Sequence, residues 1–357
     1  MNRKEKFQKL MRLKKGLLVD YMAAPEADQR LRQYYEVSTE KDLLDALNSD
    51  FFYLSARDIS QNEGYFSCCK SQPDVTEQER ICPFGIHFRR SAYDSKFAVD
   101  EAITAPLKNA SSPKDILNYP FPKRGDFDFS PLIGEAEANQ NRMIIGGLWT
   151  GIMGDSYRMY GFERFLTDLA LEPEMMHTLI DKMTEVYLDL NDAYFNTMKG
   201  KMDIWFFGND FGSQAGLLMS VDMWAEFFFD NIKKLCGLAK SYGLRVMMHS
   251  CGGIKLLIPY LIEAGVEILD PIQVTANGMQ PENLISEFGE KLIFHGAMDT
   301  QHLLPAGTPE EVSAECQRLI DLFKHSGYIF AGSQILGKDI PTENIAAMYD
   351  TVNRFNI

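Results

Sequence analysis

The chain has 357 residues, of which 45% are hydrophobic and 24% are charged, a balance typical of a soluble globular protein. Its formal net charge of −14 disfavours nucleic acid and anionic membranes as partners, because like charges repel. No apolar run approaches the ~20 residues of a membrane-spanning helix, and the basic segment 1–16 lacks the apolar core of a secretory signal. We therefore expect a cytoplasmic protein with reduced cysteines.

Seven apolar segments have the length and composition of buried strands, and each ends in polar or small residues. In chain order they are 50–58, 143–149, 202–210, 244–252, 266–273, 291–299 and 327–334.

Segments with helical periodicity lie between these strands. Residues 161–198 predict at least two helices, separated near Pro173 because proline cannot continue a helix. Residues 220–243 begin with a serine cap and end at a glycine. Residues 308–327 begin with a capping box that starts at Thr308.

Strands that alternate with helices predict right-handed βαβ units and a parallel sheet. Seven such strands favour a closed barrel over an open sheet, although the sequence does not reveal the eighth strand. The segment 64–142 breaks the alternation and predicts hairpins followed by a proline-rich crossing. We expect one α/β domain over residues 1–357, a (β/α)8 TIM barrel with an irregular, hairpin-rich excursion at about 64–142.

The active site of such a barrel lies at the C-terminal ends of its strands. His249 and Cys251 stand at one predicted strand end, and residues two apart on a strand point to the same side. Zinc accepts imidazole and thiolate together, so this pair is a candidate metal site, but the sequence does not identify a third protein ligand. The same short spacing is also typical of a packed cysteine beside a histidine that bonds to the backbone.

Other strand ends supply further candidate residues. Asp210 has the chemistry of a general acid, a general base or a cation-binding group, and its alternative role is to cap a loop. Asn209 and Asp299 are the other candidate catalytic residues. The candidate substrate-binding residues are Trp149, Met153, Gln214, Ser333 and Gln334.

From about residue 140 onward, the chain resembles the uroporphyrinogen decarboxylase superfamily. The similar motifs are "LWTGIMGDSYRMYGFERFLTDLALEPE", "FFGNDFGSQAGLLMS", "HSCGGIKLLIPYLIEAGVEILDPIQ", "FHGAMDTQHL" and "AGSQILGKDIPTENIAAMYD". The resemblance implies a (β/α)8 barrel, in agreement with the strand and helix pattern. It also implies one of two chemistries. Decarboxylases remove acetate carboxyls from uroporphyrinogen without a cofactor. Related methyltransferases move methyl groups between corrinoid proteins and thiols, with zinc activating the thiol.

The resemblance to the decarboxylases is incomplete. The arginine-rich N-terminal signature has no match, and Arg30 and Arg32 are the nearest basic pair in different surroundings. Asn209 and Asp210 replace a family serine and histidine, and a late family histidine falls on Gln334. A carboxylate at 210 is unfavourable for an octa-anionic substrate.

The resemblance to the methyltransferases is also partial. "HSCGG" matches two zinc ligands, His249 and Cys251, but the third family ligand, a cysteine, corresponds to Ser333. A hydroxyl is a poor zinc ligand, so Asp210 or a substrate atom is the alternative source. If residue 333 faces the pair, we expect Ser333→Cys to tighten zinc binding.

We expect a methyltransferase-type enzyme that moves a methyl group between a small methylated substrate, a corrinoid and an activated nucleophile. One alternative is a uroporphyrinogen III decarboxylase, which would use no cofactor, and another is a non-catalytic barrel that binds a corrinoid or small ligand. Expected partners are a small-molecule substrate, a corrinoid protein and a second copy in a homodimer. We expect one pocket to gather His249, Cys251, Asp210, Asn209, Asp299 and Gln334.

Overall fold

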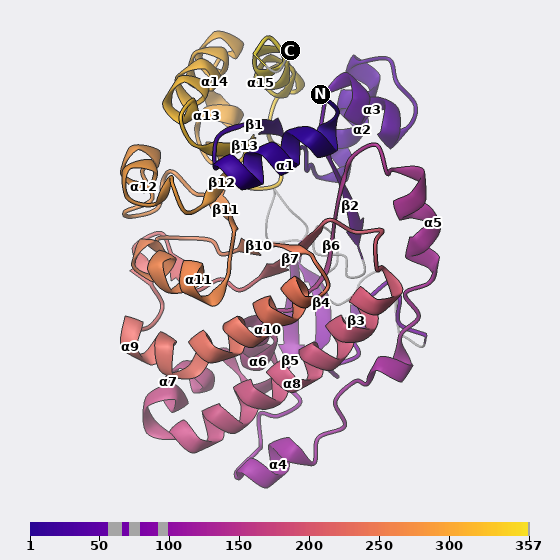
Figure 1. The fold of residues 1–357 in the computed structure, drawn as a ribbon. Helices are drawn as coiled ribbons and strands as arrows, with labels where there is room; N and C mark the ends of the chain where they lie inside the picture. The colour runs from indigo at the N-terminus through magenta and orange to yellow at the C-terminus, as the bar shows by residue number, and fades with distance from the viewer. Residues whose placement is uncertain (56–65, 71–78, 92–98, 356–357) are drawn as a thin grey trace.

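The computed structural model describes residues 1–55, 66–70, 79–91 and 99–355. Eight parallel strands form one curled sheet (Figure 1). In sheet order they are β1 (Gly16–Val19), β13 (Gly327–Gly332), β12 (Ile293–Met298), β11 (Ile268–Ile272), β10 (Arg245–His249), β7 (Ile204–Gly208), β6 (Met143–Trp149) and β2 (Phe51–Ser55).

The two end strands of this order approach each other and close the sheet. The backbone N–H of Asp50 donates to the Val19 carbonyl at 2.8 Å, and the Val19 N–H donates to Asp50 Oδ2 at 2.9 Å. The fold is therefore the expected (β/α)8 barrel. The strand that the sequence did not reveal is β1, whose four residues are too few to show a pattern. The other seven strands lie within the predicted segments.

Helices surround the barrel (Figure 1). They are α1 (Arg3–Leu13), α2 (Pro25–Tyr34), α3 (Glu40–Ala46), α4 (Pro113–Leu117), α5 (Pro131–Ala138), α6 (Ile152–Tyr160), α7 (Phe162–Leu171), α8 (Pro173–Thr197), α9 (Val221–Trp224), α10 (Asp230–Ser241), α11 (Ile258–Ala264), α12 (Pro281–Phe288), α13 (Leu303–Ala306), α14 (Pro309–Phe323) and α15 (Thr342–Asn353). Shorter turns are the 3-10 helices η1 (Arg124–Asp126) and η3 (Lys255–Leu257), and the π-helix η2 (Ala225–Phe229). None of the described helices is long and apolar enough to cross a membrane.

The predicted helix ends are largely confirmed. Pro173 begins α8 directly after α7. Ser220 accepts a hydrogen bond from the Met223 N–H, and Thr308 forms the capping box of α14 with Glu311. The π-helical turn η2, which separates α9 from α10, has no counterpart in the prediction.

The excursion contains an antiparallel sheet, as the hairpin pattern predicted. Its strands are β3 (Glu79–Ile81), β4 (His87–Ser91) and β5 (Val99–Thr104). Phe84, in the turn between β3 and β4, packs against Tyr187 of α8 at 5.4 Å between ring centroids. A small hairpin of β8 (Gly212–Ser213) and β9 (Gly216–Leu217) follows β7.

The barrel interior changes character along its axis. At the N-terminal end, α1 closes the barrel, because its Phe7, Leu10 and Met11 join the inward apolar residues of the strands in one cluster. At the C-terminal ends of the strands, the buried residues include charged groups such as Asp20, Asp270 and His295. The apolar N-terminal end of the barrel interior stabilises the fold, and the polar C-terminal end forms the floor of a pocket.

Candidate active site

A pocket of about 210 Å³ opens at the C-terminal ends of the strands. Its apolar lining comes from Met22, Trp149, Phe206, Pro271, Ala331 and Ile335. Its side-chain polar groups are Asp210, His249, Cys251, Asp270, His295 and Gln334. The described residues that line it include two carboxylates but no lysine or arginine.

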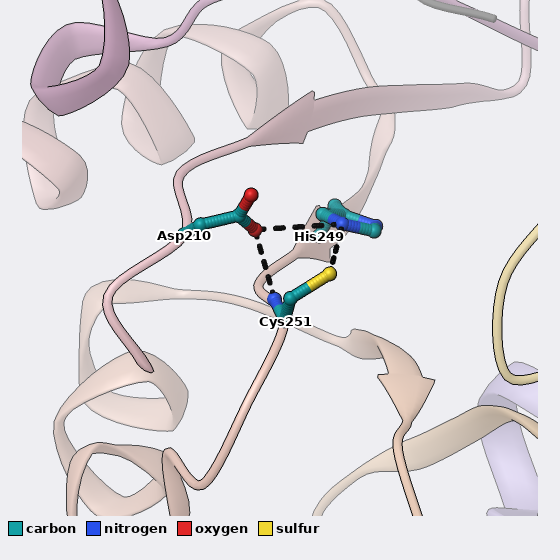
Figure 2. A group of neighbouring side chains, drawn as sticks. All are labelled: Asp210, His249 and Cys251. Atoms are coloured by element: carbon teal, nitrogen blue, oxygen red, sulfur yellow. Dashed lines mark hydrogen bonds and ion pairs between the residues drawn. The ribbon is translucent and has the colours of Figure 1, made fainter. Parts of the chain in front are cut away.

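Three potential metal ligands meet in this pocket (Figure 2). His249 ends β10 and Cys251 follows two residues later, which brings His249 Nε2 within 3.1 Å of Cys251 Sγ. Asp210 follows β7, the neighbouring strand, and its Oδ1 lies 3.5 Å from the same nitrogen. The Cys251 N–H donates to this oxygen at 2.9 Å, which fixes the carboxylate. One ligand atom of each residue lies within 4.8 Å of the others.

Asp270 orients His249 from the opposite side of the ring. Its Oδ2 lies 2.6 Å from His249 Nδ1. An ionised carboxylate only accepts hydrogen bonds, so this nitrogen carries a proton and Nε2 faces Cys251 and Asp210. Burial alone would lower the pKa of His249, but Cys251 and Asp270 outweigh burial and raise it well above its usual value. The Trp149 ring covers the histidine at 5.0 Å between centroids.

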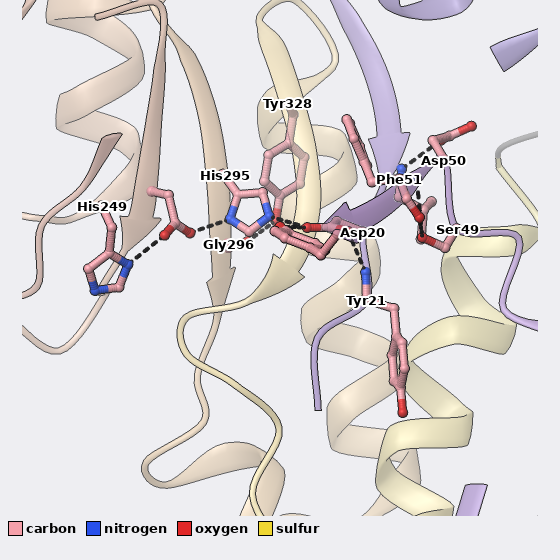
Figure 3. Close-up of polar contacts among 12 residues, drawn as sticks. Asp20, Tyr21, Ser49, Asp50, Phe51, His249, His295, Gly296 and Tyr328 are labelled. Atoms are coloured by element: carbon pink, nitrogen blue, oxygen red, sulfur yellow. Dashed lines mark hydrogen bonds and ion pairs between the residues drawn. The ribbon is translucent and has the colours of Figure 1, made fainter. Parts of the chain in front are cut away.

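A row of buried ionisable groups continues behind Asp270, and Figure 3 shows His249, His295 and Asp20 along it. His295 Nδ1 lies 2.5 Å from Asp270 Oδ1, and its Nε2 lies 2.9 Å from Asp20 Oδ2. The Tyr53 hydroxyl donates to the same Asp20 oxygen at 2.5 Å. Burial alone would lower the pKa of His295, but Asp270 and Asp20 reverse the effect and raise it to about 9.

Asp270 is stabilised as a carboxylate by its two neighbours. Burial alone would raise its pKa, but His295 and His249 outweigh burial and hold the pKa well below its usual range. The sequence analysis missed Asp20, Asp270 and His295. The available signal was a charged residue inside two segments that otherwise predicted buried strands, 266–273 and 291–299.

Gln334 completes the polar wall beside the thiol. Its Nε2 donates to Cys251 Sγ at 2.6 Å. Burial raises the pKa of the Cys251 thiol, although His249 acts in the opposite direction. Four of the six residues expected to converge therefore line the pocket, namely Asp210, His249, Cys251 and Gln334.

Asn209 and Asp299 do not line the pocket and bind backbone groups instead. Asn209 is buried, and its Oδ1 accepts from the Met153 N–H at 2.8 Å while its Nδ2 donates to the Thr150 carbonyl. Asp299 accepts from the Gln301 N–H at 2.8 Å and so holds the turn before α13. Adjacent residues at a strand end point in different directions, which explains why Asp210 enters the pocket and Asn209 does not.

The candidate substrate-binding residues are also divided. Trp149 and Gln334 line the pocket. Ser333 is buried and its Oγ lies 3.1 Å from Thr300 Oγ1, so it is not placed as a third ligand beside Cys251. Met153 is buried in the core, and Gln214 bonds to Gln301 outside the pocket lining. Asp210, rather than residue 333, groups with His249 and Cys251 as a residue that could hold a metal.

Comparisons with known proteins place this barrel in a family. A uroporphyrinogen decarboxylase from Anaeromyxobacter sp. is 24% identical over 336 residues, covering 84% of this chain and 90% of its own. One from Psychromonas ingrahamii is 24% identical over 195 residues, covering 52% of this chain and 50% of its own. A methyltransferase structure from Methanosarcina mazei shares the fold, with a TM-score of 0.69, 14% identity and full coverage of both chains. The profile of the uroporphyrinogen decarboxylase (URO-D) family matches residues 131–355, and the chain therefore belongs to this family.

Proposed function

We propose that this protein is a methyltransferase whose Asp210, His249 and Cys251 bind zinc at the mouth of the barrel. The observation that carries the proposal is the approach of one carboxylate oxygen, one imidazole nitrogen and one sulfur to within 4.8 Å of one another. These are atoms that zinc accepts, and three protein ligands leave a fourth position open for a substrate.

The surroundings of the three residues fit such an ion. A histidine ligand commonly donates its other ring N–H to a carboxylate, which sets the ring orientation and raises the basicity of the ligating nitrogen. Asp270 accepts from His249 Nδ1 in this way. Gln334 donates to Cys251 Sγ, which favours the thiolate form that binds metal.

Each residue has a distinct task in the proposed reaction. When bound, zinc supplies a Lewis acid that lowers the pKa of a nucleophile in the open position. Trp149, Phe206 and Met22 form apolar lining that holds a methylated small molecule and excludes water from it. Gln334 orients the polar end of the substrate. A corrinoid protein as methyl partner and a homodimer are further parts of this proposal.

Decarboxylation of uroporphyrinogen is the second candidate function, and the name of the Anaeromyxobacter relative favours it. The pocket argues against it, because Asp210 and Asp270 line a space of about 210 Å³. A substrate with eight carboxylates requires cationic contacts, and the described lining contains no lysine or arginine.

Metal content and turnover together test the proposal. The purified protein is loaded with zinc, dialysed and analysed for bound metal, alongside Cys251→Ser and the matched control Cys69→Ser in the excursion. We expect one zinc per chain in the wild type and the control, and loss of zinc in Cys251→Ser. Zinc-dependent demethylation within a panel of methylated small molecules, with an unmethylated cobalt(I) corrinoid or a thiol as the methyl acceptor, would support the function. A zinc-free protein that converts uroporphyrinogen would contradict it.

A further inference from the structure

We propose that His295 is a positioning residue, an imidazolium buried between Asp20 and Asp270 that fixes Asp270 and thereby aims His249 into the pocket. The inference deepens the proposed function, because the atom that is positioned is the proposed ligand atom, His249 Nε2. His295 itself touches none of the three proposed ligands through any contact of the described structure.

The protonation of His295 follows from its two partners. A neutral imidazole has one N–H donor and one lone-pair acceptor, whereas an ionised carboxylate only accepts. His295 Nδ1 lies 2.5 Å from Asp270 Oδ1 and Nε2 lies 2.9 Å from Asp20 Oδ2, so a neutral ring would point a lone pair at one carboxylate. The contact between Nδ1 and Asp270 is an ion-pair approach, since Nδ1 has no hydrogen-bond partner in the described structure. Both ring nitrogens carry protons.

Several hydrogen-bond donors hold the Asp20 side chain in place. Besides His295 Nε2, its side chain accepts from the Tyr53 hydroxyl at 2.5 Å and from the Tyr21 N–H at 2.8 Å. Its own carbonyl accepts from Tyr349 of α15. These contacts fix the Asp20 side chain against the His295 ring.

Two carboxylates from different strands contact the His295 ring, and tyrosines from other elements bond to the residues beside it. Asp20 comes from the end of β1 and Asp270 from β11, with the Tyr53 phenol of β2 behind Asp20. Tyr328 of β13 donates to the carbonyl of Gly296, the next residue after His295, and Tyr349 lies on α15. In the described structure, the ion pairs of Asp20 and Asp270 are all with histidines. The raised pKa of His295, about 9, agrees with this environment.

The imidazolium constrains His249 through Asp270. One oxygen of Asp270 contacts His295 and the other contacts His249 Nδ1 at 2.6 Å, so the carboxylate is held at both ends. A carboxylate that cannot rotate keeps the histidine ring in one orientation, with Nε2 toward Cys251. The alternative is that the row of charges only stabilises the fold.

The first test measures the protonation state of His295 and requires neither bound metal nor an activity assay. The chain has six histidines, so a ¹⁵N-histidine spectrum of the metal-free protein is simple, and His295→Gln assigns the signal. We expect both ring nitrogens of His295 to be protonated near neutral pH. A spectrum with one unprotonated ring nitrogen overturns the inference.

The second test measures zinc affinity by competition with a chromophoric chelator. His295→Gln is expected to bind zinc roughly tenfold more weakly, because Asp270, the partner of the ligating His249, loses the contact that fixes it. The matched control is His177→Gln, which removes a histidine paired with Glu226 on the outer helix α8. The control should keep wild-type affinity, and a folded His295→Gln protein with wild-type affinity overturns the inference.

The variant Asp20→Asn distinguishes a role of the Asp20–His295 pair in positioning His249 from a role in stabilising the fold. Asp20 does not line the pocket, so a purely structural role predicts lower stability with unchanged zinc affinity. We expect weaker zinc binding in folded Asp20→Asn, and no additive loss in the double variant with His295→Gln, because both act through Asp270. Unchanged affinity in Asp20→Asn, or additive losses, overturns the inference.

If the wild type binds no zinc, the proposed function fails while the inference remains testable. In proton NMR spectra of the metal-free proteins, the hydrogen-bonded Nδ1 proton of His249 should then give a low-field resonance in the wild type and in His177→Gln. In His295→Gln this resonance should disappear or shift. An unchanged resonance in folded His295→Gln overturns the inference.

Discussion

His249 and Asp270 are register partners on the neighbouring strands β10 and β11, and their side chains meet with Nδ1 2.6 Å from Oδ2. The sheet register itself therefore places a carboxylate beside the histidine. Since the backbone of both strands is fixed by the barrel, the orientation of the histidine is a property of the fold as well as of the side chains.

Asp270→Asn is expected to weaken zinc binding roughly ten- to hundredfold, because the amide replaces one acceptor oxygen by an N–H donor that cannot accept from a histidine. Chelator competition at fixed pH measures the change. Asp222→Asn on the exposed surface of α9 is the matched control. Equal affinity in Asp270→Asn and wild type would show that Asp270 does not position the metal ligand.

The stability of the metal-free protein should depend on pH through His295. Its pKa is raised to about 9 in the fold against 6.5 unfolded, so its stabilising contribution is complete below pH 6.5 and is lost as the pH rises through 9. The difference in unfolding free energy between wild type and His295→Gln should therefore narrow by on the order of 3 kcal/mol across this window. Urea unfolding of both proteins between pH 6.5 and pH 9 measures this change. A difference in unfolding free energy that stays constant with pH would refute the prediction.

Gly208→Ala should disturb the pocket wall. A Cβ at this position would lie 2.2 Å from the Trp149 ring, which packs over β7 beside His249. We expect a loss of about 1–3 kcal/mol in unfolding free energy from overpacking, together with altered tryptophan fluorescence. Gly237→Ala in α10 is the matched control, since nothing lies within 4 Å of its Cβ and alanine favours a helix. Equal stability of the two variants would argue against this packing.

Gln334→Glu, rather than Ser333→Cys, should tighten zinc binding. Gln334 Nε2 lies 2.6 Å from Cys251 Sγ, whereas the Ser333 hydroxyl contacts Thr300. A glutamate at 334 would bring a carboxylate oxygen to the place of the amide nitrogen, and because zinc accepts carboxylate ligands we expect the affinity to rise about tenfold. Competition titration of both variants decides the point, and a gain in Ser333→Cys alone would place residue 333 at the metal.

The contrast between Ser333 and its neighbour Gln334 shows which features of the site the sequence does not predict. Apolar runs that end in polar residues located seven of the eight strands, and the spacing of His249 and Cys251 correctly placed both side chains in one pocket. The choice between Ser333 and Gln334 depends on the direction of each side chain after β13, which composition does not specify.

The buried charges were missed for a related reason. Asp20 follows β1, a strand of four residues that the sequence did not reveal, and its partner His295 is 275 positions away in the chain. Asp270 and His295 lay within segments that were judged only by their apolar content. A long-range ion pair leaves no local pattern, although a charged residue inside a buried strand is itself a signal of a partner.

X-ray absorption at the zinc edge identifies the atoms that bind zinc in this protein. We expect the zinc-loaded wild type to show one sulfur neighbour at about 2.3 Å and nitrogen or oxygen neighbours at about 2.0–2.2 Å, from Cys251, His249 and Asp210. Cys251→Ser should lose the sulfur neighbour, and Cys69→Ser should keep it. Zinc with only nitrogen and oxygen neighbours in the wild type, or a protein that retains no zinc, would contradict the account.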